Sequence, residues 1–245
     1  MLNKIKSFYR FISSKHQTIH LDYRVNMVPR WNNNSPNEVL LDIIKSQDSI
    51  YAELLHGFLN YKNTFDGIKL DADNTDRNLP GWNNGFFPGL DIIALYSLLA
   101  IKSPNKYIEI GSGNSTKVAA LAKKNENLPT EIISIDPYPR AEIDQLADKI
   151  IREPFENLKY DEIYALEKND VLFVDNSHRI LPNSDAMVFF MEILPRLKPG
   201  VIVHVHDVYL PYDYPQFMCD RAYSEQYGLA AYLLANPEKY RPLMP

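Results

Sequence analysis

The sequence predicts an α/β protein with a doubly wound, mostly parallel sheet and an N-terminal helical cap. Three observations predict this fold. Short apolar runs alternate with segments of helical pattern, which is typical of a parallel sheet covered by helices. A glycine-rich turn at 111–113 joins the first apolar run to a helical segment. The apolar fraction of 45% and the charged fraction of 23% are those of an ordinary globular domain.

Composition excludes several classes of protein. A net charge of -5 leaves no excess of basic residues for a nucleic-acid scaffold. Cys219 is the single cysteine, which excludes an intramolecular disulfide and a cysteine-based zinc site. The basic start Met1–Lys6 is followed by polar residues, including Arg10, that interrupt any apolar run. We therefore expect no signal peptide, no transmembrane span, no stable membrane insertion and a cytoplasmic location.

Residues 1–85 are predicted to form the helical cap and a lid loop. Ser35, Pro36 and Glu38 form a helix-start pattern in which the serine caps and the glutamate bonds back. Helical spacing of apolar residues then predicts one amphipathic helix from Pro36 to about Asn60.

The loop that follows, 71–89, combines many Asp and Asn residues with glycines and aromatics. Such a loop forms a packed lid or pocket wall, or it docks on the core through Trp82 and Phe86. The sequence leaves both interpretations open.

Residues 86–245 are predicted to form a second unit that contains the whole sheet. The expected strands are Tyr107–Ile110, Glu131–Asp136, Lys149–Arg152, Val171–Asp175 and Val201–Val205. The expected helices are Asp91–Ala100, Lys117–Ala122, Arg140–Asp148, Leu158–Leu166, a helix capped by Ser184 that runs through Leu194, and Tyr223–Leu234. Ligands of such sheets bind beyond the carboxyl ends of the strands.

The turn after the first strand, Gly111-Ser112-Gly113-Asn114-Ser115, has the pattern of a nucleotide-binding loop. Glycine lets the backbone approach a ligand, and the free amides of the helix start face it. Asp136 ends the second strand 25 positions after Gly111, where a carboxylate can bind both hydroxyls of a ribose.

Glu109 and Thr116 help to decide whether the loop binds a dinucleotide or a cationic cofactor. Thr116 stands where a dinucleotide-binding loop has its third glycine. Glu109 directly precedes the loop, where a carboxylate would repel a pyrophosphate and attract a cationic cofactor. S-adenosylmethionine carries a sulfonium and an ammonium and no phosphate. The alternative is that Glu109 only holds the loop.

Four segments together resemble the motifs of class I S-adenosylmethionine-dependent methyltransferases. These are Glu109–Ser115, Ile135–Asp136, Asp170–His178 and Leu197–Val201. The resemblance covers roughly residues 86–236 and is greatest to a bacterial subgroup that methylates small molecules and sugars. It implies a Rossmann-like fold, S-adenosylmethionine as cofactor, and O-methylation of a small molecule or sugar. The implied cofactor-binding residues are Glu109, Gly111, Ser112, Gly113, Asn114, Ser115, Asp136 and Asp175.

The class usually ends its sheet with an antiparallel hairpin. Here an extended segment begins at Tyr240 and no such hairpin is recognised. We therefore expect a sheet that is shorter or lacks its final strand, with an exposed edge.

Methyl transfer requires that the acceptor be aligned and deprotonated. His178, His206 and Asp207 are the catalytic candidates, because imidazole has the right pKa range to accept a hydroxyl proton. A histidine in a strand or loop is, however, more often structural. The resemblance also raises metal assistance, since some O-methyltransferases hold a divalent cation where Asp175 and Asp207 stand, and His206 would be a third ligand. The His206-Asp207 pair departs from the family's usual pair, so the metal stays open.

Other interpretations also remain. The loop Tyr209–Pro215, with three tyrosines and two prolines, stacks on an acceptor ring or packs on the loop around Trp82. The alternatives to a methyltransferase are an NAD-dependent oxidoreductase or epimerase, and a cofactor-binding protein without catalysis. Tyr164 and Lys168 have the spacing of the first alternative but precede the fourth strand. The motifs considered so far identify neither the acceptor nor the oligomeric state, and both stay open.

Overall fold

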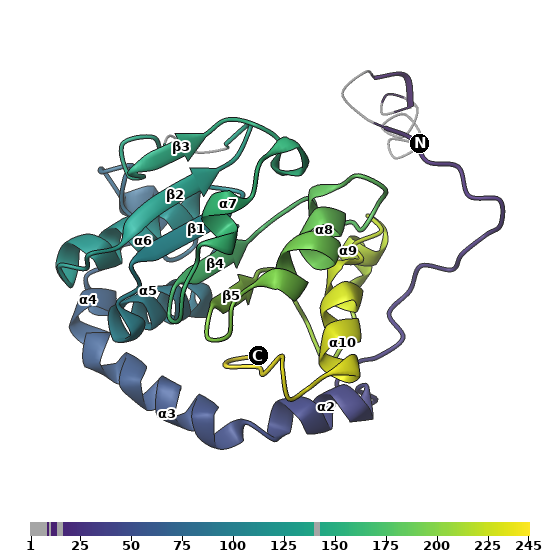
Figure 1. The fold of residues 1–245 in the computed structure, drawn as a ribbon, viewed down its shortest axis with the longest axis horizontal. Helices are drawn as coiled ribbons and strands as arrows, with labels where there is room; N and C mark the ends of the chain where they lie inside the picture. The colour runs from purple at the N-terminus through teal and green to yellow at the C-terminus, as the bar shows by residue number, and fades with distance from the viewer. Residues whose placement is uncertain (1–8, 10, 14–16, 140–142) are drawn as a thin grey trace.

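A computed structural model describes the chain except residues 1–8, 10, 14–16 and 140–142 (Figure 1). Its centre is a sheet of five strands that are all parallel, in the order β3-β2-β1-β4-β5. The strands are β1 (Lys106–Ile110), β2 (Glu131–Ile135), β3 (Lys149–Ile151), β4 (Val171–Val174) and β5 (Ile202–Val205). The order reverses between β1 and β4, and such a switch point is where ligands bind in doubly wound sheets.

The helices lie on both faces of this sheet and beside its β5 edge (Figure 1). The α-helices are α2 (Glu38–Lys45), α3 (Asp48–Phe58), α4 (Lys62–Asp66), α5 (Leu90–Lys102), α6 (Asn114–Asn125), α7 (Asp161–Tyr164), α8 (Asp185–Val188), α9 (Gln216–Cys219) and α10 (Glu225–Ala235). The 3-10 helices are η1 (Leu59–Tyr61), η2 (Asp71–Asp73), η3 (Phe155–Asn157) and η5 (Leu194–Arg196), and η4 (Phe189–Ile193) is a π-helix.

Alternate side chains of the strands enter two separate cores, because successive residues of a strand point to opposite faces. One core packs Tyr107, Val171 and Phe173 against α5 and α6. The other packs Ile108 and Leu172 against α7, α8 and η4. The central strands β1, β2 and β4 are therefore buried on both sides, which explains their largely apolar sequences.

The α/β class, the doubly wound sheet and all five strands are confirmed. The predicted helix 36–60 is two helices, since the chain turns at Ser46 and Gln47 between α2 and α3. Its cap is Asn37, not Ser35, because the Asn37 side chain accepts a hydrogen bond from the Leu40 amide at 3.2 Å. Ser184 does cap α8, accepting from Met187 at 3.1 Å.

Two other predicted helices differ more from the structure. Residues 143–148 form a turn rather than the end of a helix 140–148, whose first three residues lie outside the described chain. Asp148 there accepts the Ile132 amide at 2.7 Å and so closes the loop onto β2. The predicted helix 158–166 is reduced to the single turn of α7.

The cap helices pack on elements of the second unit: α2 contacts α10, and α3 contacts α5. The division of the chain at residue 85 stays a prediction. None of the described helices is long and apolar enough to cross a membrane, and the basic start Met1–Lys6 lies outside the described residues.

Candidate functional site

The glycine loop lies against the end of β4. Gly111 has a φ of 83°, and a Cβ added there would lie 2.0 Å from the carbonyl oxygen of Asp175. A side chain at this position would therefore have to displace backbone, and only glycine adopts this conformation without strain. The contact brings the loop after β1 and the end of β4 together at the switch point of the sheet.

Glu109 is fully buried behind the loop and does not face the cleft. Its carboxylate accepts hydrogen bonds from the hydroxyls of Tyr107 at 3.1 Å and Ser115 at 2.9 Å, and also from Thr116. Burial raises the pKa of Glu109 to about 7, and these hydroxyl bonds oppose the rise. The geometry favours the alternative considered above, in which Glu109 holds the loop. A direct attraction for a cationic cofactor is not supported.

Asp136 lies at the end of β2 and is half-buried. Its Oδ2 accepts the Ser112 amide at 2.9 Å and the Ser112 hydroxyl at 3.3 Å, while its Oδ1 accepts the Tyr138 amide at 2.7 Å. Each carboxylate oxygen has two lone pairs, so the carboxylate retains capacity for a ligand hydroxyl. Asp136 therefore orders the loop and also faces the cleft.

The loop 81–87 is fixed to the start of α6. The Asn114 amide group donates to Asn84 Oδ1 at 3.0 Å, and Asn84 in turn bonds the backbone of Phe87 in both directions. Trp82 and Phe87 pack into the core beside α5, whereas Phe86 is 60% exposed. The loop thus docks on the core, and the docking residue paired with Trp82 is Phe87 rather than Phe86.

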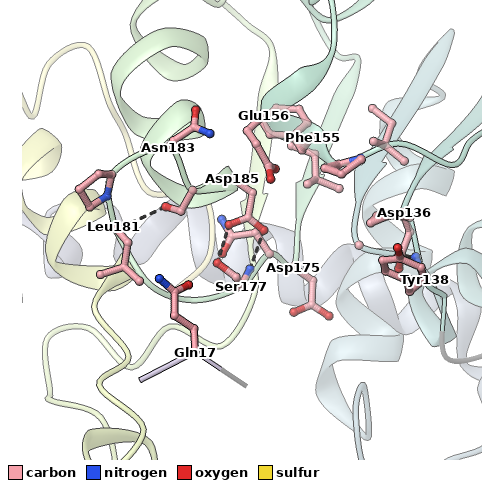
Figure 2. A pocket seen from close by; sticks show the side chains of 18 of the residues that line it. Gln17, Asp136, Tyr138, Phe155, Glu156, Asp175, Ser177, Leu181, Asn183 and Asp185 are labelled. Carbon is pink, nitrogen blue, oxygen red and sulfur yellow. Dashed lines mark hydrogen bonds between the residues drawn. The ribbon is translucent and has the colours of Figure 1, made fainter. Parts of the chain in front are cut away.

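A pocket of about 760 Å³ opens beyond the carboxyl ends of β1, β2 and β4. In Figure 2, Asp136 and Tyr138 form one end, Leu181 and Asn183 the other, and Asp175 lies between them. Gly111 also lines it. Its lining carboxylates are those of Asp136, Glu156, Asp175 and Asp185, and no Lys or Arg is among its described lining residues.

Next to this pocket, His178 joins three carboxylates. Its Nε2 lies 3.5 Å from Asp175 Oδ1 and 3.7 Å from Asp207 Oδ2, and its Nδ1 lies 2.5 Å from Glu225 Oε1. Glu225, in the first turn of α10, is completely buried. His178 has a φ of 64° and its ring stacks on Tyr223 at a centroid distance of 4.4 Å. The ring is thus held with Nε2 toward the two aspartates.

His206 approaches the same aspartates from the end of β5. Its Nδ1 lies 3.8 Å from Asp175 Oδ1 and 3.7 Å from Asp207 Oδ1, and its Nε2 lies 3.6 Å from Asp91 Oδ2. These distances exceed those of hydrogen bonds, and the buried Nδ1 has no hydrogen-bond partner among the described residues. The two imidazoles therefore flank Asp175 and Asp207 with space between the polar atoms.

The carboxylates dominate the protonation of this cluster. Burial lowers the pKa of His178, but the hydrogen bond and charge of Glu225 outweigh it, so the pKa lies above its ordinary value. Burial likewise opposes protonation of His206, and Asp175 and Asp91 raise its pKa to about 10. His204, two positions earlier in β5, has its pKa lowered to about 4 by burial and by His206. The surrounding carboxylates thus favour the protonated form of both His178 and His206.

The aromatic loop 209–215 packs away from Trp82. Tyr214 is fully buried among Tyr209, Tyr223 and Tyr227, and its hydroxyl accepts the Gln226 amide at 2.9 Å. Packing on the loop around Trp82 is therefore not observed. Tyr209 is 38% exposed next to the cluster, and its contact with an acceptor ring stays a prediction.

Apart from Glu109, which is buried behind the loop, the predicted site residues fall into three groups. Gly111, Asp136 and Asp175 line the pocket. His178, His206 and Asp207 form the adjoining cluster. Ser112, Gly113, Asn114 and Ser115 shape the loop, and none of these four lines the pocket in the described chain.

Sequence reasoning missed Glu225 and Asp91, which come from helices distant in sequence from the strand ends. The one available signal was an acidic residue in the first turn of each otherwise apolar helix. That position is also the ordinary place for a carboxylate that favours the helix dipole, so the pattern alone does not separate the two roles.

Known proteins match the part of the chain that holds this site. Residues 108–208 match a family described as a methyltransferase domain. An uncharacterized protein of Archaeoglobus fulgidus is 34% identical over 105 residues, which are 42% of this chain and 46% of that protein. The chain thus spans about half the length of that relative. The family match runs from β1 past β5 and supports a class I methyltransferase.

Proposed function

We propose that this chain is an S-adenosylmethionine-dependent methyltransferase that methylates an oxygen of a small molecule or sugar. The observation that carries the proposal is the acidic pocket at the switch point of the sheet, lined by Gly111, Asp136 and Asp175. Its volume of about 760 Å³ is within the usual range of small-ligand pockets. The methyltransferase family match covers the strands whose ends form it.

The lining favours a cationic cofactor over a dinucleotide. Four carboxylates and no lysine or arginine, among the described lining residues, would leave a pyrophosphate without a counter-charge. The same carboxylates suit a sulfonium and an ammonium group. We therefore assign the attraction for a cationic cofactor to the carboxylates that line the pocket, rather than to Glu109. Tyr164, the tyrosine of the dehydrogenase-like spacing, bonds the Glu192 carbonyl at 3.4 Å and does not line the pocket.

When bound, S-adenosylmethionine would supply an activated methyl carbon: the new bond to the acceptor oxygen would form as the C–S bond breaks and its electron pair stays on sulfur. Asp136 would bind the ribose hydroxyls. Asp175, which lines the pocket and lies within 4 Å of both histidines, marks the boundary between the cofactor side and the acceptor side. The hydroxyl proton goes to a basic group of the cluster, either the Nε2 of a deprotonated His178 or a carboxylate of Asp175 or Asp207.

A divalent cation also fits the cluster. Asp175, His178 and Asp207 each offer a ligand atom, and these atoms lie within 4.8 Å of one another. The hydrogen bond of His178 Nδ1 to buried Glu225 is the arrangement that orients metal-binding histidines. The unpaired Nδ1 of His206 faces the same two aspartates. A bound cation would lower the pKa of the acceptor hydroxyl. We propose Asp175, His178 and Asp207 as its ligands.

Calorimetry tests the cofactor. We expect micromolar binding of S-adenosylmethionine or S-adenosylhomocysteine, lost in Asp136→Ala, and weaker binding of NAD. Glu153→Ala, an exposed carboxylate outside the pocket, serves as the control for loss of charge. Tighter binding of NAD than of S-adenosylmethionine would overturn the proposal. Binding without methylation of any acceptor in a broad hydroxyl-compound panel would leave a cofactor-binding protein.

Manganese titration followed by electron paramagnetic resonance tests the metal separately from activity. Binding of Mn²⁺ that is weakened by both His178→Ala and Asp207→Asn supports the cation site. Unchanged binding in both variants, or no binding to the wild type, would restrict the cluster to proton transfer.

A further inference from the structure

The segment before the cap, residues 18–28, runs outside the packed layers of the protein (Figure 1), and near its start Ile19 lines the pocket described above. It has no helix or strand, and no hydrogen bond links residues 18–26 to the body within the described chain. The segment is anchored where it meets the fold, since the Gln216 side chain donates to the Met27 carbonyl at 2.9 Å and the Arg30 amide donates to Asp213 Oδ2 at 2.9 Å. We call residues 18–28 the arm.

The arm has the sequence of a strand with one apolar face. Apolar residues stand at every second position, and the residues between them are polar; the apolar set is Ile19, Leu21, Tyr23, Val25 and Met27, and the polar set is His20, Asp22, Arg24 and Asn26. This period of two is that of a half-buried strand. The five apolar side chains are nevertheless between 41% and 74% exposed. An exposed strand sequence with an apolar face is a segment that pairs with another chain.

The arm is complementary to itself. When two arms run antiparallel with Tyr23 opposite its own copy, Leu21 faces Val25, and Ile19 faces Met27. On the other face of the ribbon, Asp22 lies opposite Arg24, and this pair occurs twice because of the two-fold symmetry. Directly opposed residues of an antiparallel pair point to the same face, so the register places apolar with apolar and acid with base.

Charge selects this register. A shift by one residue would move the apolar face of one arm to the polar face of the other. A shift by two residues along one strand would keep the faces but centre the pairing on Asp22 or Arg24, which would oppose like charges. Of these registers, the one centred on Tyr23 places apolar with apolar residues and also pairs Asp22 with Arg24 twice.

We propose that two copies of this chain associate by antiparallel pairing of their arms, centred on Tyr23. A fully paired arm spans roughly 34 Å, so the two bodies lie at opposite ends of the ribbon. A two-stranded ribbon alone is marginally stable in water, so its apolar face must pack on protein. Phe217, which follows the anchoring Gln216 and is 58% exposed, provides apolar surface where each arm leaves the fold.

Sedimentation velocity on the full chain tests the dimer by charge exchange. The wild type should sediment with twice the mass of the 28.3 kDa chain. Asp22→Arg places Arg against Arg at both positions and Arg24→Asp places acid against acid, so each should weaken dimerisation by about tenfold or more. Mixed in equal amounts, the two variants should form heterodimers, because every opposed pair then has opposite charges. The double variant Asp22→Arg/Arg24→Asp should dimerise like the wild type.

Disulfide trapping tests the register. Tyr23→Cys places two cysteines directly opposite, at a Cα separation of about 4.5–5.5 Å that a disulfide spans. It should form a covalent dimer under mild oxidation. His20→Cys is the matched control in the same arm: its two copies are six residues apart along the ribbon, roughly 20 Å, and should not cross-link.

The outcomes separate the proposal from other interfaces. A wild type that stays monomeric at all concentrations refutes it, as does a dimer unchanged by both single charge variants. Cross-linking of His20→Cys as readily as Tyr23→Cys refutes the register. Rescue by mixing, together with selective cross-linking at position 23, supports it. None of these measurements depends on the proposed methyltransferase activity.

Discussion

Glu109→Gln should remove a pH dependence of stability that the buried carboxylate imposes on the wild type. Glu109 is fully buried, and its pKa rises from 4.5 to about 7 on folding. Between these values the folded state keeps a proton that the unfolded state has lost. The folded state binds more protons there, so stability falls as the pH rises through this window.

The magnitude follows from the size of the pKa change. Each pH unit within the window costs about 1.4 kcal/mol, so the wild type loses about 3 kcal/mol between pH 4.5 and pH 7 from this group alone. The glutamine side chain of the variant is neutral and of the same shape. It accepts and donates hydrogen bonds, and the hydroxyls of Ser115 and Thr116 can rotate to match it. The variant should therefore keep the conformation of the loop and lose the decrease in stability with rising pH that Glu109 causes.

Urea unfolding of the two proteins at pH 5, 6, 7 and 8 measures the effect. The other titrating groups, including the histidine cluster, are common to both proteins, so the difference in unfolding free energy isolates Glu109. Glu153→Gln, at an exposed position, is the control for an ordinary glutamate. We expect the unfolding free energy of the variant to increase relative to that of the wild type as the pH rises. A difference that stays flat from pH 5 to pH 8 would refute the assignment of a raised pKa to this buried carboxyl.

Other substitutions probe the loop and the cluster. Gly111→Ala should destabilise the fold by about 3 kcal/mol, because it combines a left-handed φ with a clash against backbone; Gly113→Ala, whose methyl meets nothing within 4 Å, should lower the melting temperature less. Asp170→Ala should cost about 2 kcal/mol in chemical denaturation, because the buried carboxylate accepts the amides of Lys106 and Glu167. Glu225→Gln should lower the pKa of His178, measured by NMR titration of its ring; an unchanged value would show that Glu225 does not control it.

The strands and the pocket residues at their ends follow from sequence because one physical rule controls each. Strands buried on both faces are rich in apolar residues, so β4 and most of β1 stand out without tertiary information. Ligands bind at the carboxyl ends of such strands, which predicts Asp136 and Asp175 as soon as the strands are found.

Helix boundaries and partner residues do not follow in this way. Within the described residues 143–148, the predicted end of a helix is replaced by a turn in which Asp148 accepts the Ile132 amide, a contact that forms only on folding. The position of Glu109 before the loop leaves two roles open, and its burial and its three hydroxyl donors, which favour a role in holding the loop, are visible only in the folded chain. Glu225 meets His178 across 47 positions of sequence, and only the packing of α10 brings them together.

The start of the arm has a thermodynamic consequence. Gln17, which directly precedes the arm, lines the acidic pocket alongside Asp136 and Asp175 (Figure 2). Ile19 of the arm lines the same pocket. If the arm pairs with a second copy, ligand binding in the pocket is thermodynamically coupled to the association of two chains, because the same segment takes part in both. Linkage is reciprocal, so a ligand that binds the pocket more tightly in one association state shifts the association constant by the same factor. Ligand binding in the pocket would then change the fraction of dimer that sedimentation velocity measures.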